Sequence, residues 1–289
     1  MKSKELAEDT RMEKLLEAEQ EYVGEIGYRF HNENDKHLHT FNGKPLLGTS
    51  TVTSVLAKPL TWWASGLACE KFGWINKGNA KKGWTPKEER LQSVANFRVG
   101  ANHLSDEEWL ALCDEAYSAH SKKLDSTATE GTDMHAELER FVNDKISGKA
   151  IDVSNYIPKI HPFILWSEQN VKRFIASEGH TYSTKLWVGG ITDCILELND
   201  GKIGIMDFKS SKESYDSQFM QIAGYELQIN ENGVYDDNGV QTWKADKPFD
   251  FYAVVPFGAE KFTVDMRYNT DELKDGFIAM VTLYKIINK

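Results

Sequence analysis

The sequence predicts a mixed α/β (α+β) protein in which helices come first and a small sheet with one inserted helix follows. Through most of the first 177 residues, apolar side chains recur at helical spacing. After Ser177, short alternating segments separated by glycine-containing breaks are typical of strands. At roughly 150 residues per domain, a length of 289 residues suggests about two domains. We expect a mainly helical N-terminal portion over 1–127 and a sheet-containing core over 128–289, or one continuous domain.

Local patterns predict the elements of the N-terminal portion. Residues 1–26 are rich in Glu and Lys, with apolar residues at helical spacing, and predict an exposed amphipathic helix. The alternating stretch at 28–41 predicts a β-hairpin. Further helices are expected over 53–74 (interrupted by Pro59), 105–127, 130–146 and 155–177.

The core is expected to alternate between strands and helices. Strands are predicted over 182–187, 191–198 and 202–209, with breaks at Gly189-Gly190 and Asn199-Asp200-Gly201. A helix over 213–230, strands over 249–256 and 261–268, and a closing helix over 270–287 complete the core.

Composition excludes several classes of protein. With 44 acidic and 34 basic residues, the net charge of −10 argues against a polybasic arm or a uniformly basic nucleic-acid coat, though not against a local basic groove. No apolar run approaches the ~20 residues of a membrane span, and the polar N-terminus lacks a signal core. The three cysteines lie too far apart in sequence for a zinc or iron–sulfur motif. These features predict a protein of the cytoplasm.

One segment of this acidic chain is basic. Between Lys71 and Arg90 there are six Lys or Arg residues against two Glu, and Trp74 and Trp84 lie among them. Lysines can follow a phosphate backbone while aromatic side chains stack on exposed bases. The alternative is a solvated loop whose tryptophans belong to the core, and we favour that alternative for the two tryptophans.

Two adjacent predicted strands carry acidic residues on apolar rows. In the strand at 202–209, Asp207 and Lys209 continue a row of isoleucines, and in the preceding strand Asp193 does the same. A three-residue turn at Asn199-Asp200-Gly201 sets Asp193 opposite Asp207, with Cβ atoms roughly 4.5–5.5 Å apart. Facing carboxylates either share a proton or hold a divalent cation. A structural Asp–Lys pair at the sheet end explains the pattern equally well.

Other polar residues have the spacing of a supporting set. His135 and Glu139 share one face of a predicted helix, and an imidazole beside two carboxylates suits manganese or magnesium. Gln221 and Tyr225 lie one turn apart on the helix that follows the strands. Taken singly, each of these residues is explained as well by a structural or surface role. Glu178 is a candidate for a supporting acid or simply ends a helix.

In order and spacing, these residues resemble the RecB-like branch of the PD-(D/E)XK nuclease superfamily. The matching motifs span residues 131–225 and are Gly131…His135…Glu139, Gly190…Asp193, Asp207-Phe208-Lys209 and Gln221…Tyr225. The 51–63 stretch is loosely similar to the helical N-terminal portion of phage-type exonucleases of this group. No P-loop motif and no four-cysteine cluster accompany these motifs in the sequence.

The resemblance implies a PD-(D/E)XK-like core with a central mixed β-sheet flanked by helices. It implies one or two Mg²⁺ or Mn²⁺ ions held by His135, Asp193, Asp207 and the Phe208 carbonyl. It further implies a catalytic Lys209, which acts with the two aspartates, and contacts from Gln221 and Tyr225 to the substrate backbone. Ser210, Ser211 and Lys212 follow the catalytic strand and are placed to touch phosphate. Glu139 and Glu178 are candidates for a supporting role behind the ligands.

These features predict a metal-dependent DNA exonuclease that acts on linear single- or double-stranded ends in recombination or end processing. A phage-encoded enzyme with a recombination partner protein fits this prediction. A structure-specific endonuclease is the rival with the same chemistry. A nuclease-like DNA-end binding module without turnover is the rival of a different class. The intact set of Asp193, Asp207 and Lys209 counts against this module, because facing charges are costly to keep.

Overall fold

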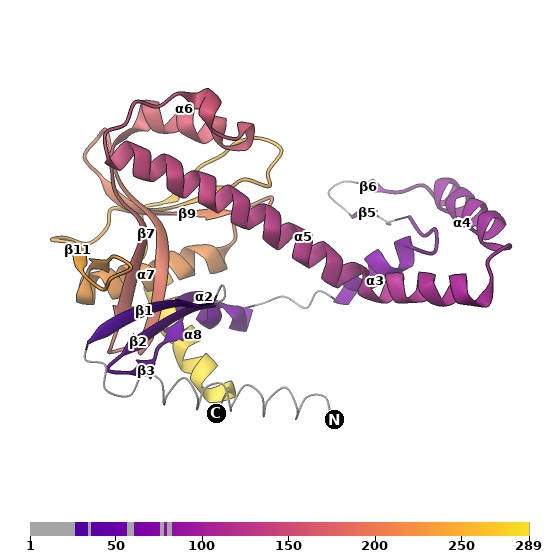
Figure 1. Ribbon diagram of the computed structural model, residues 1–289, viewed down its shortest axis with the longest axis horizontal. Coiled ribbons are helices and arrows are strands. Elements are labelled where there is room, and N and C mark those ends of the chain that lie inside the picture. Colours follow the sequence, from indigo (N-terminus) through magenta and orange to yellow (C-terminus); the bar gives the residue numbers. More distant parts are fainter. Residues whose placement is uncertain (1–26, 34–35, 57–60, 76–77, 80–82, 289) are drawn as a thin grey trace. The chain divides into compact units, whose positions relative to one another are not determined.

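The computed structural model describes residues 27–33, 36–56, 61–75, 78–79 and 83–288 (Figure 1). The helix predicted over 1–26 and the interruption predicted at Pro59 lie outside these residues. The chain divides into two compact units. Of the described residues, those up to 56 and those from 133 to 288 form the sheet unit, and those from 61 to 132 form the helical unit.

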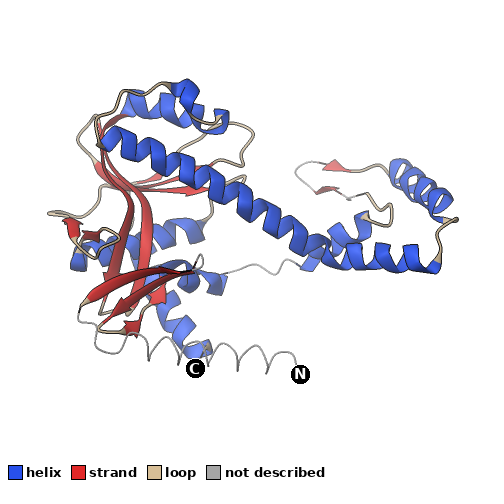
Figure 2. Cartoon of the chain, in the orientation of Figure 1, coloured by secondary structure: helices blue, strands red, loops and turns tan. Residues whose placement is uncertain are grey.

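The sheet unit is built around an eight-stranded mixed sheet, which confirms the predicted fold class (Figure 2). Seven strands follow one another in the order β11-β10-β7-β8-β9-β12-β13, and β4 pairs with β8. The β9–β12 and β4–β8 pairs are parallel and the others are antiparallel. The strand bounds are β4 (Leu47–Gly48), β7 (Val171–Ser183), β8 (Val188–Leu198), β9 (Ile203–Lys209), β10 (Val234–Tyr235), β11 (Gln241–Trp243), β12 (Phe251–Pro256) and β13 (Asp265–Arg267).

Helices cover both faces of this sheet. On one face, α6 (His161–Asn170) and the part of α5 (Asp106–Ile146) from Asp133 onward pack on even-numbered residues of β8 and β9, such as Leu196 and Met206. On the other face, α7 (Asp216–Asn232) packs on odd-numbered residues such as Ile195 and Ile205. The two faces of these strands therefore have distinct cores. In each core, a fully buried apolar side chain stabilises the fold by about 1.5–3 kcal/mol.

The N-terminal segment of the sheet unit adds a second small sheet and a short helix. Strands β1 (Tyr28–Glu33) and β2 (Lys36–Phe41) form the predicted hairpin, and β3 (Lys44–Pro45) pairs with β2. The Tyr28 ring stacks on the ring of Tyr182 in β7, with centroids 4.4 Å apart. After β4, helix α2 (Thr49–Thr53) continues as a 3₁₀ turn (Ser54–Leu56), and Val52 packs with the closing helix α8 (Asp271–Ile287).

The helical unit contains α3 (Thr61–Glu70), α4 (Lys87–Ala101), the first part of α5 and a two-stranded β5–β6 pair (Gly78–Asn79 and Gly83–Trp84). Its aromatic cluster joins Phe72, Phe97 and Trp109. The sequence prediction missed α4, although Pro86 precedes its first turn and Glu88 and Glu89 lie in that turn. Trp74 in the basic segment is half-buried.

Several predicted bounds are wrong. The helix expected over 155–177 ends at Asn170, because the β-branched and aromatic residues that follow form β7. The strand expected over 182–187 is the end of β7 followed by a turn, and Gly189-Gly190 lies inside β8 instead of breaking it. The helices expected over 105–127 and 130–146 form one helix, α5.

The division into units also differs from the predicted boundary after residue 127. Residues 27–56 belong with the sheet because β4 pairs with β8 and the β1–β3 sheet packs on Tyr182. The other boundary lies at residue 133, close to the predicted one. In the part of the chain that the structure describes, no helix is both long and apolar enough to cross a bilayer.

Candidate metal centre

The β8–β9 hairpin has the register that its turn residues predict. The Leu198 amide donates to the Lys202 carbonyl over 2.8 Å, and Gly201 adopts a φ of 85° that glycine readily accepts. The ladder runs regularly from Glu197–Ile203 to Cys194–Met206. The ladder ends there, one residue before the position at which the same register would set Asp193 against Asp207. The predicted register is thus confirmed for the paired part of the hairpin.

Strand β8 changes partners next to this aspartate pair. Along one edge, Val188 and Gly189 pair with β4, whereas the residues from Cys194 onward pair with β9. Among the described residues, none pairs as a strand with the intervening Gly190–Asp193 stretch on that edge. In place of a ladder bond, the Asp193 carboxylate Oδ2 accepts a hydrogen bond from the Phe208 amide over 2.6 Å. The sheet is therefore open beside Asp193.

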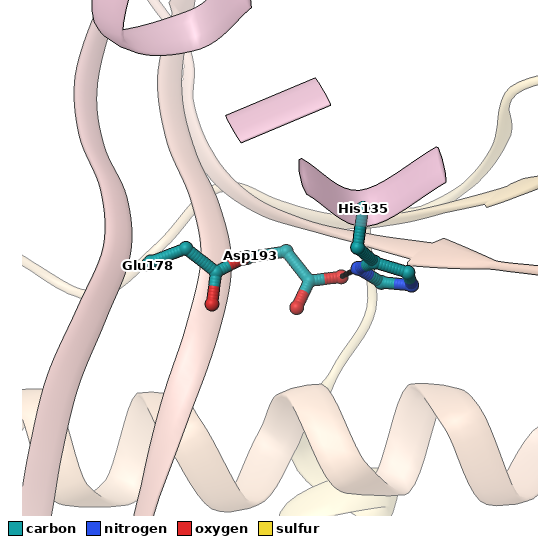
Figure 3. Close-up of side chains that lie close together, drawn as sticks. All are labelled: His135, Glu178 and Asp193. Carbon is teal, nitrogen blue, oxygen red and sulfur yellow. Dashed lines mark ion pairs between the residues drawn. The ribbon is translucent and has the colours of Figure 1, made fainter. Parts of the chain in front are cut away.

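Three side chains that can bind a metal ion converge at this opening. His135, Glu178 and Asp193 each offer a ligand atom, and these atoms lie within 4.8 Å of one another. The His135 Nδ1 is 3.8 Å from the Asp193 Oδ2. Figure 3 shows the two carboxyl groups side by side, with the imidazole on the far side of Asp193. Glu178 and Asp193 come from the consecutive strands β7 and β8, and His135 comes from α5.

His135 and Asp193 reach each other from different faces of the sheet. Helix α5 packs Met134 and Leu138 on the face of Cys194 and Phe208, whereas Asp193 belongs to the α7 face. The imidazole lies near the Phe208 ring, with centroids 6.4 Å apart. Because β8 and β9 are not paired at Asp193, the side chains of the two faces can meet there.

Glu178 has an unusual backbone conformation for a strand residue. Its φ is 46°, in the left-handed region that side chains other than glycine rarely adopt. The neighbouring pairs Ser177–Cys194 and Gly179–Thr192 set it directly across from Asp193. Burial, together with the charges of Asp193, Glu139 and Asp207, raises the pKa of Glu178 to about 9. Without a cation, this pair of carboxyl groups therefore retains a proton at neutral pH.

Asp207 and Lys209 form a buried ion pair beside the three ligand candidates. The Lys209 Nζ lies 2.6 Å from the Asp207 Oδ2, and apart from this ion pair neither oxygen of Asp207 has a hydrogen-bond partner among the described residues. Burial raises the pKa of Asp207 to about 7, although Lys209 acts against this shift. Burial lowers the pKa of Lys209, but the charges of Asp207 and Asp193 outweigh it and raise this pKa. Lys209 therefore keeps its proton.

The residues predicted to contact substrate lie on α7 and after β9. The Gln221 Nε2 donates to the Tyr225 hydroxyl over 2.7 Å, and burial raises the pKa of Tyr225 well above its ordinary value. Of the three residues after β9, Ser210 and Lys212 are exposed, and the Ser211 hydroxyl donates to the Glu213 carbonyl within the loop. That Ser210, Ser211 and Lys212 contact phosphate stays a prediction.

Gly190 has a packing reason to be glycine. A Cβ at this position would lie 2.6 Å from the Thr49 Oγ1 and 2.8 Å from a ring carbon of Tyr225. The Gly190…Asp193 and Gln221…Tyr225 motifs are thus in physical contact, because the tyrosine ring packs against the bare glycine backbone.

Two features of the site escaped the sequence prediction. Glu178 was expected to play a supporting role, yet it lies within ligand distance, while Asp207 is outside the group of three and pairs with Lys209. Reading β7 as a helix up to residue 177 hid the position of Glu178 across from Asp193. Glu139, the other supporting candidate, is exposed, and its pKa is raised by partial desolvation and by the charge of Asp237. The second feature is a pocket partly lined by β2 and α2, which no local pattern indicates.

Comparison of the chain with protein-family models and with curated proteins finds no match. The resemblance to the PD-(D/E)XK superfamily therefore stays a prediction that depends on the motifs and on the geometry described above.

Proposed function

We propose that this protein is a divalent-metal-dependent deoxyribonuclease that hydrolyses DNA from strand ends. One observation carries the proposal: an imidazole and two carboxyl groups from three separate elements converge at an opening in the sheet, beside a buried lysine–aspartate pair. Charged groups at a core-facing position are costly unless they are paired or bind an ion. We therefore expect these charged groups to bind an ion, because ion binding would offset the free-energy cost of their burial.

The donor set fits a magnesium or manganese ion. His135, Glu178 and Asp193 supply one nitrogen and several oxygen ligands, which suit a hard or borderline divalent cation. Apart from its ion pair with Lys209, the buried Asp207 carboxylate has no hydrogen-bond partner among the described residues, so it offers a further ligand if it turns from Lys209. When bound, such an ion lowers the pKa of water and neutralises the charge of a phosphodiester.

The remaining residues have separate tasks in this proposal. Lys209 stays protonated, so it orients the attacking water and stabilises the charge that develops on the phosphate, and it is not the general base. Gln221 and Tyr225 hold the DNA backbone at the α7 side of the site. Ser210 and Lys212, which are exposed, bind a neighbouring phosphate in this proposal. The proposal assigns this activity to the cytoplasm of a bacterium or a phage-infected cell.

A cleavage assay tests the proposal. Labelled linear DNA and covalently closed circular DNA are incubated with the protein and with Mn²⁺, Mg²⁺ or EDTA. We expect loss of linear DNA with either metal, intact circles, and no reaction in EDTA. Cutting of circles would indicate an endonuclease, and metal-independent binding without cleavage would indicate an inactive module.

Variants link this activity to the site. Asp193→Ala and Asp207→Ala should abolish cleavage while retaining the circular-dichroism spectrum of the wild type. Asp200→Ala, which changes an exposed aspartate at the turn of the same hairpin, is the matched control and should cleave normally. Full activity in both site variants would remove these aspartates from the mechanism.

A further inference from the structure

A pocket of about 280 Å³ adjoins the three ligand candidates and includes two of them, Glu178 and Asp193, in its wall. Strand β8 lines it with Gly189, Gly190 and Ile191, and α7 lines it with Gln221 and Tyr225. The opposite wall comes from the N-terminal segment of the sheet unit and consists of His37, His39, Gly48, Thr49, Ser50 and Thr51. All of these residues belong to the sheet unit.

Apart from its two acids, this pocket is lined by residues without a permanent charge. The described residues that line it include no lysine and no arginine. Burial, followed by the neighbouring His180, lowers the pKa of His39 to about 3, so that imidazole is neutral. Hydroxyl, amide and imidazole groups line the remainder of the wall. A phosphate would find no lysine or arginine there, whereas a sugar and a base would find hydroxyl, amide and imidazole groups as hydrogen-bond partners.

One polar side chain that lines the pocket, Thr49, already forms hydrogen bonds within the protein. The Thr49 hydroxyl donates to the Gly189 carbonyl over 3.0 Å and accepts from the Gln228 Nε2 over 2.8 Å. Strand β4 pairs with the same part of β8. Ser50, the next residue, is exposed toward the pocket. The N-terminal segment is thus fixed against the sheet and presents Ser50 and Thr51 to the space beside the acids.

The size of the pocket limits what it can hold. Ligand pockets commonly measure about 300–1,000 Å³, and this one lies just below that range. One nucleoside is the expected upper limit for its contents.

We infer that this pocket holds the sugar and base of the terminal nucleotide, with its phosphate at the His135–Glu178–Asp193 group. The reaction and the position of the phosphate rest on the proposed function, because two carboxyl groups hold a phosphate only through a bound cation. The position of the sugar and base in the pocket does not. In that reaction, the water oxygen forms a bond to phosphorus and the bond from phosphorus to the next sugar oxygen breaks. One proton of the water goes to solvent and the departing oxygen receives one, so each event releases a mononucleotide.

Filling the pocket tests the inference. Ser50→Trp places a large ring in the pocket, and Ser54→Trp places the same ring one turn later at an exposed serine outside the pocket. Calorimetry in Mn²⁺ measures the binding of thymidine 5′-monophosphate, thymidine 3′-monophosphate and inorganic phosphate. The wild type and the Ser54 variant should bind the tighter thymidine nucleotide at least tenfold more tightly than inorganic phosphate. The Ser50 variant should lose that preference while it retains phosphate binding.

The products of cleavage provide the second readout. We expect the wild type and the Ser54 variant to release mononucleotides from linear DNA, and the Ser50 variant to release them at least tenfold more slowly. Equal binding of nucleotide and phosphate by the wild type, or an unchanged Ser50 variant, would overturn the inference even if cleavage is normal. Nucleotide preference without any cleavage would instead overturn the proposed function and support the occupant assigned to the pocket.

Discussion

The β8–β9 hairpin carries the pattern Asp-x-Lys twice, once at each end. Asp200 and Lys202 form an ion pair at the turn, with side chains 50% and 45% exposed. Asp207 and Lys209 form the other pair at the site, with side chains 1% and 23% exposed. The surroundings shift the pKa values of the two carboxyl groups in opposite directions. The hydrogen bond from Lys202 lowers the pKa of Asp200, whereas burial raises that of Asp207. An identical pattern is thus an exposed ion pair at one end and a buried ion pair with a raised carboxyl pKa at the other.

The largest expected difference between the two ends is catalytic. Lys209→Ala should reduce the rate of linear-DNA cleavage by about 10²–10³-fold, because it removes a preorganised cation from the reacting phosphate. Lys202→Ala should change that rate less than twofold. Single-turnover cleavage in Mn²⁺ measures both rates. Comparable losses in the two variants would mean that the site end of the hairpin has no special role.

The second difference concerns stability. Lys209→Met leaves Asp207 buried without its cation, and breaking a buried pair in this way costs about 3–5 kcal/mol. Asp207 can take up a proton instead, so we expect a loss near 3 kcal/mol. Adding Asp207→Asn should restore most of it. Lys202→Met should stay within about 0.5 kcal/mol of the wild type, as surface changes usually do. Urea unfolding in EDTA measures the free energy of unfolding of the wild type, the two single variants and the double variant. An unchanged value for Lys209→Met would contradict the buried ion pair.

Part of the site at this end of the hairpin could be predicted from the sequence alone. The turn residues Asn199-Asp200-Gly201 determined the register, and apolar alternation distinguished Asp207 from Asp200, because only Asp207 continues a row of isoleucines. Short-range rules suffice for both. Glu178 was not recognised as a ligand candidate because its place depends on β7 pairing with β8. The wall formed by β2 and α2 depends on contacts between residues about 140 positions apart, such as Thr49 with Gly189. Spacing along the chain carries no such information.

The third difference is the pH dependence of stability. The raised pKa of Asp207, about 7, means that the folded chain binds more protons than the unfolded chain from about pH 4 to 7. The contribution of Asp207 to the free energy of unfolding therefore falls as the pH rises through that range, by at most about 1.4 kcal/mol per pH unit. The lowered pKa of Asp200 has the opposite sign. We expect Asp207→Asn to make stability rise more with pH than in the wild type, and Asp200→Asn to make it rise less, in urea unfolding with EDTA.

The smallest expected difference lies in the glycines at the two ends of the hairpin. A Cβ at Gly201 meets open space, so Gly201→Ala costs only the strain of its positive φ, about 1 kcal/mol. A Cβ at Gly190 would meet both Thr49 and the buried Tyr225 ring at less than 3.0 Å, so Gly190→Ala forces them apart at a cost of about 1–3 kcal/mol. Only the Gly190 variant should also weaken cleavage, because the displaced residues line the pocket beside Glu178 and Asp193. Equal activity in the two variants at matched stability would show that the contact between Gly190 and Tyr225 serves packing alone.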